Sequence, residues 1–531
     1  MIYPFDHAHN ATVEQITQRV GGKGASLWAM TTQLQLPTPP GFTIGCDYSA
    51  IFDREGITQA LAQQIDTHLQ RLELALGRTL GGTGTPLLLS VRSGAPVSMP
   101  GMMETVLNVG LTADNLSGLA AASGSPIFAL DSYARFLGMY CSCVLHADVP
   151  TELKAGRPDA GESDLEQRIA TLREIAESHG AGDDLANPRR LLLNTIGAVF
   201  RSRHSAPARA YIEREGLVSD LGTSVTVQAM VFGNMDVSSG TGVVFSRDPS
   251  TGVNELTGDW LPQAQGEDVV AGLRATRTIE DLASEFPSIY RELGEHAARL
   301  ENWYQDMVDI EFTIEQGRLW ILQARRGKRS LKAAARIAVE LAENGTFGTT
   351  RASAVQRVGK ETILNAARES TAGGQVFTAG IGASPGTATG RVAMTSEAAI
   401  ELAEEDEPVI LVRRETSPSD IHGMSAATGI LTSLGGLMSH AAVVARDWNL
   451  PAVVGAADID IDLDKNGFRV GGHFVAAGET LSIDGASGSV YLGDVSRTTQ
   501  QDPYIEKLRE WASEPAANTP TPAKQQGVTT C

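Results

Sequence analysis

His440 stands between a double-glycine turn and an apolar segment, in the sequence GGLMSHAAVVAR. We expect a helix to begin at Ser439 or His440, directly after a buried strand in GILTSLGG. The free N–H groups and partial positive charge of a helix N-terminus disfavour imidazolium and stabilise an attached phosphoryl group. His440 is therefore a candidate phosphate acceptor. The alternative is a structural histidine that caps a buried helix.

A second group of polar residues lies in DIEFTIEQGRLWILQAR, which the pattern predicts to be two strands joined by a tight turn. Asp309 and Glu311 share one face of the first strand, because side chains alternate along a strand. Two adjacent carboxylates repel each other unless a cation lies between them, and oxygen ligands suit Mg²⁺ with nucleotide phosphates. Gln323 and Arg325 share one face of the returning strand. A solvated strand face is the alternative.

Two cations in glycine-rich surroundings are candidate phosphate ligands. Lys23 lies in GGKGASL, a predicted turn before a helix whose spacing differs from that of a Walker A loop. Arg92 ends the apolar strand LLLSVRS, and an arginine fork suits bidentate phosphate binding. The loop that follows contains Gly94, Pro100 and Gly101 and is a candidate cover for a triphosphate. The alternatives are a plain turn and an ion-paired arginine at a strand end.

The elements that carry these residues predict a mixed α/β and α+β chain of several domains. Residues 1–329 alternate short strands, glycine-rich loops and helices, with a mostly helical part at about 112–215. Residues 330–375 predict a helical connector that ends in a small-residue hinge. A compact α/β unit follows at 376–497. In the tail, 498–531, we expect one short helical stretch after Asp502, and otherwise a composition typical of disorder.

The composition excludes several classes of function. A chain of 531 residues predicts three or four domains, and its net charge of −20 argues against binding to nucleic acid or an anionic membrane. The four cysteines form no CxxC pair, which indicates a reducing compartment. The N-terminus has no apolar signal core, and no apolar run approaches the ~20 residues that cross a bilayer. We expect a cytoplasmic protein.

With these residues in hand, the chain resembles the pyruvate, phosphate dikinase family over most of residues 18–497. The resemblance lies in many long motifs that occur in the family's order. They are GGKGASL, SVRSGAPVSMPGMMETVLNVGL, QAMVFGNMDVSSGTGVVFSRDPSTG, AQGEDVVAGLR, DIEFTIEQGRLWILQAR, ILVRRETSPSDIHGM and GGLMSHAAVVAR.

The resemblance implies an ATP-grasp fold followed by a swivelling phosphohistidine domain. Lys23 and Arg92 would bind ATP phosphates beneath the loop that contains Gly101 and Thr105. The remaining nucleotide-site residues would be Glu267, Asp309, Glu311, Gln323 and Arg325, with Mg²⁺ at Asp309 and Glu311. His440 would accept phosphate as ATP and phosphate become AMP and pyrophosphate. The phosphohistidine would then phosphorylate pyruvate to phosphoenolpyruvate.

Two departures from the family qualify this expectation. The family's TIM barrel, which binds pyruvate and needs about 250 residues, has no counterpart in the sequence. We therefore expect the chain to stop at phosphohistidine, with the barrel on a separate chain or another phosphoryl acceptor. Met438 replaces a family threonine two residues before the histidine, which excludes phosphorylation at that position and leaves Ser439 available. A homodimer is a further expectation.

Two other hypotheses remain open at this point. One is a phosphoenolpyruvate-synthase-like phosphotransferase, or one that acts on another small molecule. The other is an ATP-binding regulatory protein without catalysis, although every expected catalytic position holds a competent residue.

Overall fold

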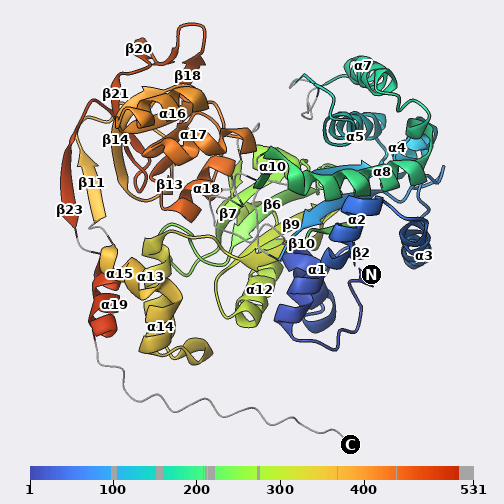
Figure 1. The fold of residues 1–531 in the computed structure, drawn as a ribbon, viewed down its shortest axis with the longest axis horizontal. Helices are drawn as coiled ribbons and strands as arrows, with labels where there is room; N and C mark the ends of the chain where they lie inside the picture. The colour runs from blue at the N-terminus through green and yellow to red at the C-terminus, as the bar shows by residue number, and fades with distance from the viewer. Residues whose placement is uncertain are drawn as a thin grey trace, which may run out of the picture.

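The computed structural model describes residues 1–96, 104–150, 153, 160–206, 208–209, 212, 222–271, 276–366, 369–437, 439–500 and 502–513. Their strands form two five-stranded sheets, an eight-stranded sheet, a three-stranded sheet and a two-stranded ribbon. In Figure 1 the N-terminal half is blue to green, the histidine-bearing domain is orange, and the helical connector lies beneath that domain. The described chain is thus a mixed α/β protein of several domains, as the sequence predicts.

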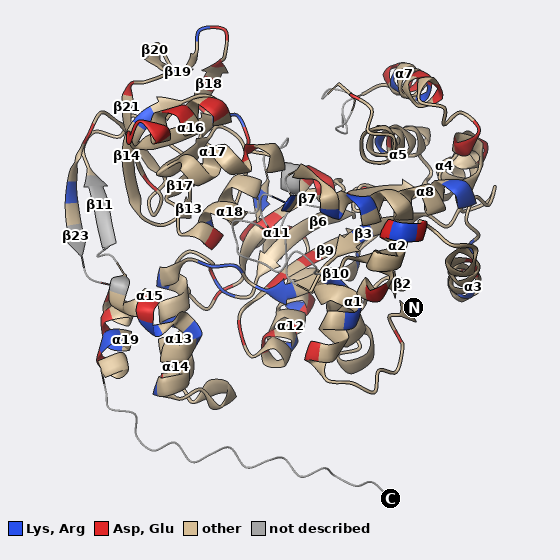
Figure 2. Cartoon of the chain, viewed as in Figure 1, with Lys and Arg blue, Asp and Glu red and all other residues tan. Residues whose placement is uncertain are grey.

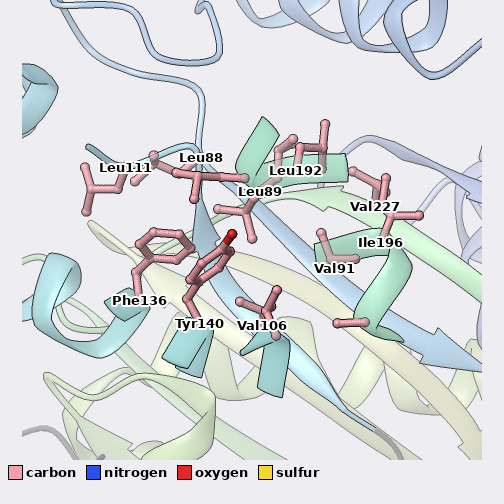
Figure 3. Packing of buried hydrophobic residues seen from close by; sticks show 14 of the residues in the cluster. Leu88, Leu89, Val91, Val106, Leu111, Phe136, Tyr140, Leu192, Ile196 and Val227 are labelled. Atoms are coloured by element: carbon pink, nitrogen blue, oxygen red, sulfur yellow. The ribbon is translucent and has the colours of Figure 1, made fainter. Parts of the chain in front are cut away.

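The first sheet is antiparallel, with the strand order β1-β2-β5-β3-β4. The strands are β1 (Ile2–Pro4), β2 (Gly41–Ile44), β3 (Leu89–Gly94), β4 (Thr105–Val109) and β5 (Ser224–Ala229). The helices of this region are α1 (Val13–Trp28), α2 (Ser49–Glu55), α3 (Gln59–Leu76), α4 (Leu116–Ser123), α5 (Pro126–Met139), α7 (Glu162–Ser178) and α8 (Pro188–Arg201). Figure 3 shows Phe136 of α5 and Leu192 and Ile196 of α8 in one core with Leu89 and Val91 of β3.

The second sheet, which we call the nucleotide sheet, is also antiparallel and has the order β10-β9-β6-β7-β8. The strands are β6 (Gly240–Phe245), β7 (Thr257–Pro262), β8 (Arg277–Thr278), β9 (Val308–Glu315) and β10 (Arg318–Arg326), and the helices are α10 (Gly266–Ala271), α11 (Ile279–Glu285) and α12 (Pro287–Tyr304). The predicted strand pair is confirmed: it turns at Gln316 and Gly317, whose φ values of 50° and 73° suit a two-residue hairpin. Helix α12 packs its apolar side, including Leu293, against Ile310 and Phe312.

The connector contains three helices and then a strand. They are α13 (Leu331–Glu343), α14 (Arg351–Val358), α15 (Lys360–Asn365) and β11 (Glu369–Gly373). Strand β11, where the sequence predicts a hinge of small residues, pairs antiparallel with β23 (Ser496–Gln500). The chain therefore enters and leaves the histidine-bearing domain through one ribbon, visible at the left of Figure 1.

The tail contains the short helix expected after Asp502, and its first residues are part of a strand, where the sequence predicts disorder. Residues 498–500 belong to β23, and α19 (Pro503–Ser513) packs Ile505, Leu508 and Trp511 against apolar residues of α13 and α14. The physical reason is the amphipathic spacing of these apolar residues, which gives the helix a buried face. Residues 514–531 lie outside the described residues.

The histidine domain is built on the eight-stranded sheet, in the order β12-β22-β21-β14-β15-β16-β17-β13. Its strands are β12 (Thr378–Ala379), β13 (Ile381–Ser384), β14 (Thr387–Ala393), β15 (Val409–Arg413), β16 (Gly429–Thr432), β17 (Ala452–Val454), β21 (Thr480–Asp484) and β22 (Ser489–Leu492). The three-stranded sheet comprises β18 (Ile459–Asp462), β19 (Gly467–Val470) and β20 (His473–Ala476). The helices are α16 (Ser396–Glu404), α17 (Ile421–Ala426) and α18 (His440–Trp448).

The described helices carry charged residues of both signs. Figure 2 shows acidic and basic segments interspersed along the helices. In the described part of the chain, no helix combines the length and the apolar character needed to cross a membrane.

Candidate functional site

The predicted polar residues of β9 and β10 gather on one face of the nucleotide sheet. Asp309 lies opposite Arg325 of β10 and Phe245 of β6, and Glu311 lies opposite Gln323 in the same strand pair. Directly opposed residues of antiparallel strands share a face, so these side chains form adjacent cross-strand rows. Ile310 and Phe312 point to the other face, under α12, which confirms the expected alternation.

Each carboxylate of β9 has a partner. The guanidinium of Arg325 donates from Nε to Oδ2 of Asp309 at 2.8 Å, and Nε2 of Gln323 donates to Oε1 of Glu311 at 3.0 Å. Burial raises the pKa of Asp309, while the charge of Arg325 opposes that rise. The neighbouring charge of Asp309 in turn raises the pKa of Arg325. The site therefore places opposite charges next to each other on one face of the sheet.

Arg92, on β3 of the first sheet, contacts residues of the nucleotide sheet at this face. Its Nη2 donates to Oε1 of Gln228 and, at 3.2 Å, to the carbonyl of Leu322, while its Nη1 lies 3.7 Å from Oε2 of Glu311. Thr105 is the cross-strand partner of Arg92 in β4.

Arg92 thus lies beside Glu311, and both are residues that the sequence predicts for one nucleotide site. Thr105 marks the end of the predicted cover loop beside it. Gly101 lies outside the described residues.

Lys23 lies in helix α1, just after a break in that helix. Gly21 has φ 74°, and a Cβ there would come within 2.6 Å of Oγ of Ser224, so only glycine fits. The sequence predicts a turn before a helix; the structure adds a helical segment ahead of the break. Burial, together with the charges of Arg92 and Arg325, lowers the pKa of Lys23 to about 7, and Glu311 opposes this.

Glu267 belongs to a different cluster. Its Oε1 accepts a hydrogen bond from Nη1 of Arg135 at 2.6 Å, and the same guanidinium binds Asp268 and Asp131. Burial raises the pKa of Glu267. The structure therefore ties Glu267 to α5 through an arginine that the sequence analysis did not identify, and shows no bond between it and the β9–β10 residues.

The carboxylates of Asp309 and Glu311 on β9 are the expected ligands of Mg²⁺. The described residues contain no group of three His, Cys, Asp or Glu side chains placed to hold a metal ion. Mg²⁺ in nucleotide sites is commonly held by one or two carboxylates together with phosphate oxygens and water. Asp309 and Glu311 supply two carboxylates on one face, so the residues fit a Mg²⁺ that binds together with a nucleotide.

His440 is the first residue of α18, as the sequence predicts. The turn before it has Gly435 at φ 104°, and Oγ of Ser439 caps the helix by accepting from the N–H of Ala442 at 3.4 Å. Nε2 of His440 is buried and has no hydrogen-bond partner among the described residues.

The surroundings of His440 keep its imidazole neutral. Burial lowers the pKa of His440 to about 4, and the nearby carboxylate of Asp420 opposes that shift. The ring is therefore uncharged at pH 7. A neutral imidazole with an unengaged nitrogen is a competent nucleophile. Met438, the expected departure from the family, lies outside the described residues.

Helix α18 packs on the face of the nucleotide sheet that bears the carboxylates. Val443 lies in an apolar cluster with Val243 of β6, which is the direct cross-strand neighbour of Glu311. The guanidinium of Arg446 lies over the ring of Phe245, 5.6 Å from its centroid. The histidine helix and the predicted nucleotide ligands thus meet on one surface.

The structure identifies site residues that the sequence analysis did not. Gln228 holds the Arg92 guanidinium, Asp420 acts on His440, and Arg446 lies at the domain interface. Arg446 is contained in GGLMSHAAVVAR, and its charge within an otherwise apolar helix face was the available signal. Asp420 is contained in the quoted ILVRRETSPSDIHGM, whereas nothing local marks Gln228.

Comparison with known proteins gives matches over most of the chain. The family model described as "Pyruvate phosphate dikinase, AMP/ATP-binding domain" matches residues 58–281 and 275–345, and "PEP-utilising enzyme, mobile domain" matches residues 405–488. Pyruvate, phosphate dikinases of Clostridium symbiosum and Rhizobium meliloti (strain 1021) are each 40% identical over 96% of this chain. The chloroplastic enzyme of Mesembryanthemum crystallinum is 40% identical over 93% of it. The chain spans 60%, 60% and 54% of these three proteins, respectively.

Proposed function

Because this chain belongs to the pyruvate, phosphate dikinase family, we propose that it uses ATP and phosphate to phosphorylate its own His440. The observation that carries the proposal is the packing of α18 on the face of the nucleotide sheet that bears Asp309 and Glu311. The helix that begins at His440 thus contacts, through Val443 and Arg446, the sheet that carries the carboxylates suited to a polyphosphate with Mg²⁺.

The proposed reaction has two transfer steps, one to His440 and one to inorganic phosphate. A ring nitrogen of His440 forms a bond to the β-phosphorus of ATP, and the bond from that phosphorus to the α-bridging oxygen breaks, releasing AMP. An oxygen of inorganic phosphate then forms a bond to the γ-phosphorus, the bond from that phosphorus to the β,γ-bridging oxygen breaks, and pyrophosphate leaves. The β-phosphoryl group stays on the histidine. The N-terminus of α18 stabilises its negative charge.

Residues of the two sheets hold the triphosphate during this step. Lys23 and the Arg92 fork would bind phosphate oxygens, while Arg325 neutralises charge beside Asp309. A Mg²⁺ bound by Asp309 and Glu311 would neutralise and orient the phosphates. The Gly101–Thr105 loop would close over them and exclude water. Glu267, held by Arg135, is proposed to lie near the nucleotide from the α10 side.

Transfer from phosphohistidine to pyruvate is the second half of the proposal. We propose that a barrel on a separate chain binds pyruvate and phosphoenolpyruvate. The histidine domain would reach it by swivelling on the β11–β23 ribbon, since both of its connections to the rest of the chain pass through this ribbon.

The test is incorporation of label from ATP carrying radioactive β-phosphate, in the presence of Mg²⁺ and phosphate. We expect acid-labile label in the wild type and none in His440→Ala. His422→Ala, which removes an exposed histidine of the same domain, is the matched control and should label normally. Equal label in His440→Ala would refute the assignment of the acceptor. Absence of label in the wild type would favour a regulatory ATP-binding protein, and label without phosphate would favour synthase-like chemistry.

A further inference from the structure

Arg446 is a fully buried arginine in the helix that carries the histidine. Its exposed fraction is 0%, although it lies on α18 where the histidine domain meets the nucleotide sheet. A buried cation costs several kcal/mol unless hydrogen bonds and charges compensate it. The contacts of Arg446 therefore indicate what the charge does there.

Two of its contacts hold the histidine domain together around His440. Nη2 donates to the carbonyl of Leu437 at 2.6 Å, and Nη1 donates to the carbonyl of Ala383 at 3.1 Å. Leu437 lies in the turn that leads into α18, three residues before His440. The guanidinium thus ties this turn to strand β13.

Its other interactions cross to the nucleotide sheet. The guanidinium lies over Phe245, the cross-strand neighbour of Asp309. Burial lowers the pKa of Arg446 to about 10, and the carboxylates of Asp309, Asp248 and Asp259 oppose that shift. The compensating negative charges thus come from the other domain.

We propose that Arg446 is a positioning residue that seats helix α18 on the nucleotide sheet and fixes the turn before His440. The expected effect of Arg446 on phosphorylation of His440 rests on the proposed function. Its role in holding α18 against the nucleotide sheet does not. When the domains are together, one side chain holds the turn and contacts the sheet that carries the phosphate ligands. A lysine cannot do both, because an ammonium lacks the planar fork that spans two carbonyls.

The experiment uses the full chain with Arg446→Met and Arg446→Lys. Labelling from β-labelled ATP is followed over a range of ATP concentrations. We expect kcat for labelling to fall at least about tenfold in both variants, because misplacement of a reacting group slows transfer steeply. KM for ATP should change less than kcat, because the hydrogen bonds of Arg446 go to the backbone carbonyls of Leu437 and Ala383 and not to a side chain proposed to bind the nucleotide.

Hydrogen exchange without nucleotide gives a second and independent readout. In both variants we expect faster exchange in α18 and in β6, where the domains meet, and unchanged exchange in β3 and β5. Arg469→Met is the matched control, because Arg469 also stacks on a phenylalanine, Phe474, but in the three-stranded sheet. It should match the wild type in both assays.

The outcomes separate the two proposals. If the wild type takes up no label, the proposed function fails, while the exchange experiment still decides whether Arg446 seats the helix. Wild-type exchange at α18 and β6 in Arg446→Met would overturn the inference, as would unchanged kcat in a labelling-competent protein. If thermal unfolding shows that the histidine domain itself is destabilised in both variants, Arg446 belongs to that domain's own core. This result would also overturn the inference.

Discussion

Lys328 and Asp447 form an ion pair across the domain interface, with Nζ of Lys328 2.5 Å from Oδ1 of Asp447. Lys328 follows β10 of the nucleotide sheet, and Asp447 lies on α18, seven residues after His440. Close by, the backbone N–H of Leu331 donates to Oδ1 of Asn449 at 3.1 Å. The C-terminal end of the histidine helix is therefore attached to the start of the connector by polar contacts, while its middle packs on the sheet through Val443.

This ion pair predicts a salt-sensitive docking of the two domains. Lys328→Met should weaken docking by about 1 kcal/mol, the usual contribution of a partly exposed pair, and slow His440 labelling severalfold. Raising NaCl from 0.05 to 0.5 M should slow the wild type more than the variant, because salt screens the pair. Lys465→Met removes an exposed ion pair with Asp462 and should behave as wild type. Identical salt dependence in Lys328→Met would contradict the prediction.

Lys23 predicts a pH-dependent affinity for ATP. Its pKa, lowered to about 7, means that the free site loses a positive charge as pH rises from 6 to 8. The Kd for ATP, measured by calorimetry with Mg²⁺, should therefore rise across this range, by at most about tenfold per pH unit. Lys23→Arg keeps its charge over the same range and corrects for titration of the nucleotide itself. Parallel pH profiles for the wild type and Lys23→Arg would count against a lowered pKa.

His440 predicts a pH dependence of stability with a defined sign. The pKa of about 4 in the folded chain lies below the ordinary value of 6.5, so the unfolded state binds the proton more tightly. The contribution of His440 to stability is complete above pH 6.5 and is lost as pH falls toward 4. Comparison of wild type with His440→Gln by urea unfolding should show a difference that shrinks by up to about 1.4 kcal/mol per pH unit in that window.

A direct measurement can check the same prediction. The imidazole carbon shifts of His440, observed by NMR with selective labelling, should remain those of a neutral ring at pH 5.5. A midpoint for His440 near 6.5 would contradict the burial argument.

Asp309 and Glu311 predict the Mg²⁺ dependence of labelling. Asp309→Asn and Glu311→Gln should each raise the Mg²⁺ concentration for half-maximal labelling at least about tenfold, because each removes a charged oxygen ligand. Glu315→Gln is the control on the same strand, since Glu315 accepts a hydrogen bond from the N–H of Phe232 instead. Unchanged Mg²⁺ dependence in both site variants would exclude the metal assignment.

Trp511 predicts that the C-terminal helix stabilises the connector. Its side chain is 8% exposed, packs in the cluster shared by α13, α14 and α19, and lies under the guanidinium of Arg351. Trp511→Ala should destabilise this cluster by about 3–5 kcal/mol, the usual cost of removing a buried aromatic side chain. Hydrogen exchange in α13 and α14 should accelerate, whereas Glu510→Ala should leave it unchanged. Unaltered exchange in Trp511→Ala would contradict the packing role.

Local features of the chain determined a substantial part of the site. The alternation of DIEFTIE specified that Asp309 and Glu311 share a face, and the double glycine followed by Ser439 specified where the helix of His440 begins. Backbone geometry and capping act over a few residues, so a single sequence contains enough information for both. A short helical stretch after Asp502 was also predicted, whereas the packing of α19 against α13 and α14 was not.

Only the tertiary structure decided which of these local features meet. Arg92 reaches the carbonyl of Leu322, 230 residues away in the chain, and Glu267 is instead held by Arg135. Helix α18 packs on the nucleotide sheet through Arg446 and Val443, and none of these contacts has a local signature. Such contacts depend on burial and charge balance between segments that loop closure brings together, and local sequence patterns do not encode those distances. The residue types and their spacing thus determined which groups could do chemistry, whereas packing decided which of them share one surface.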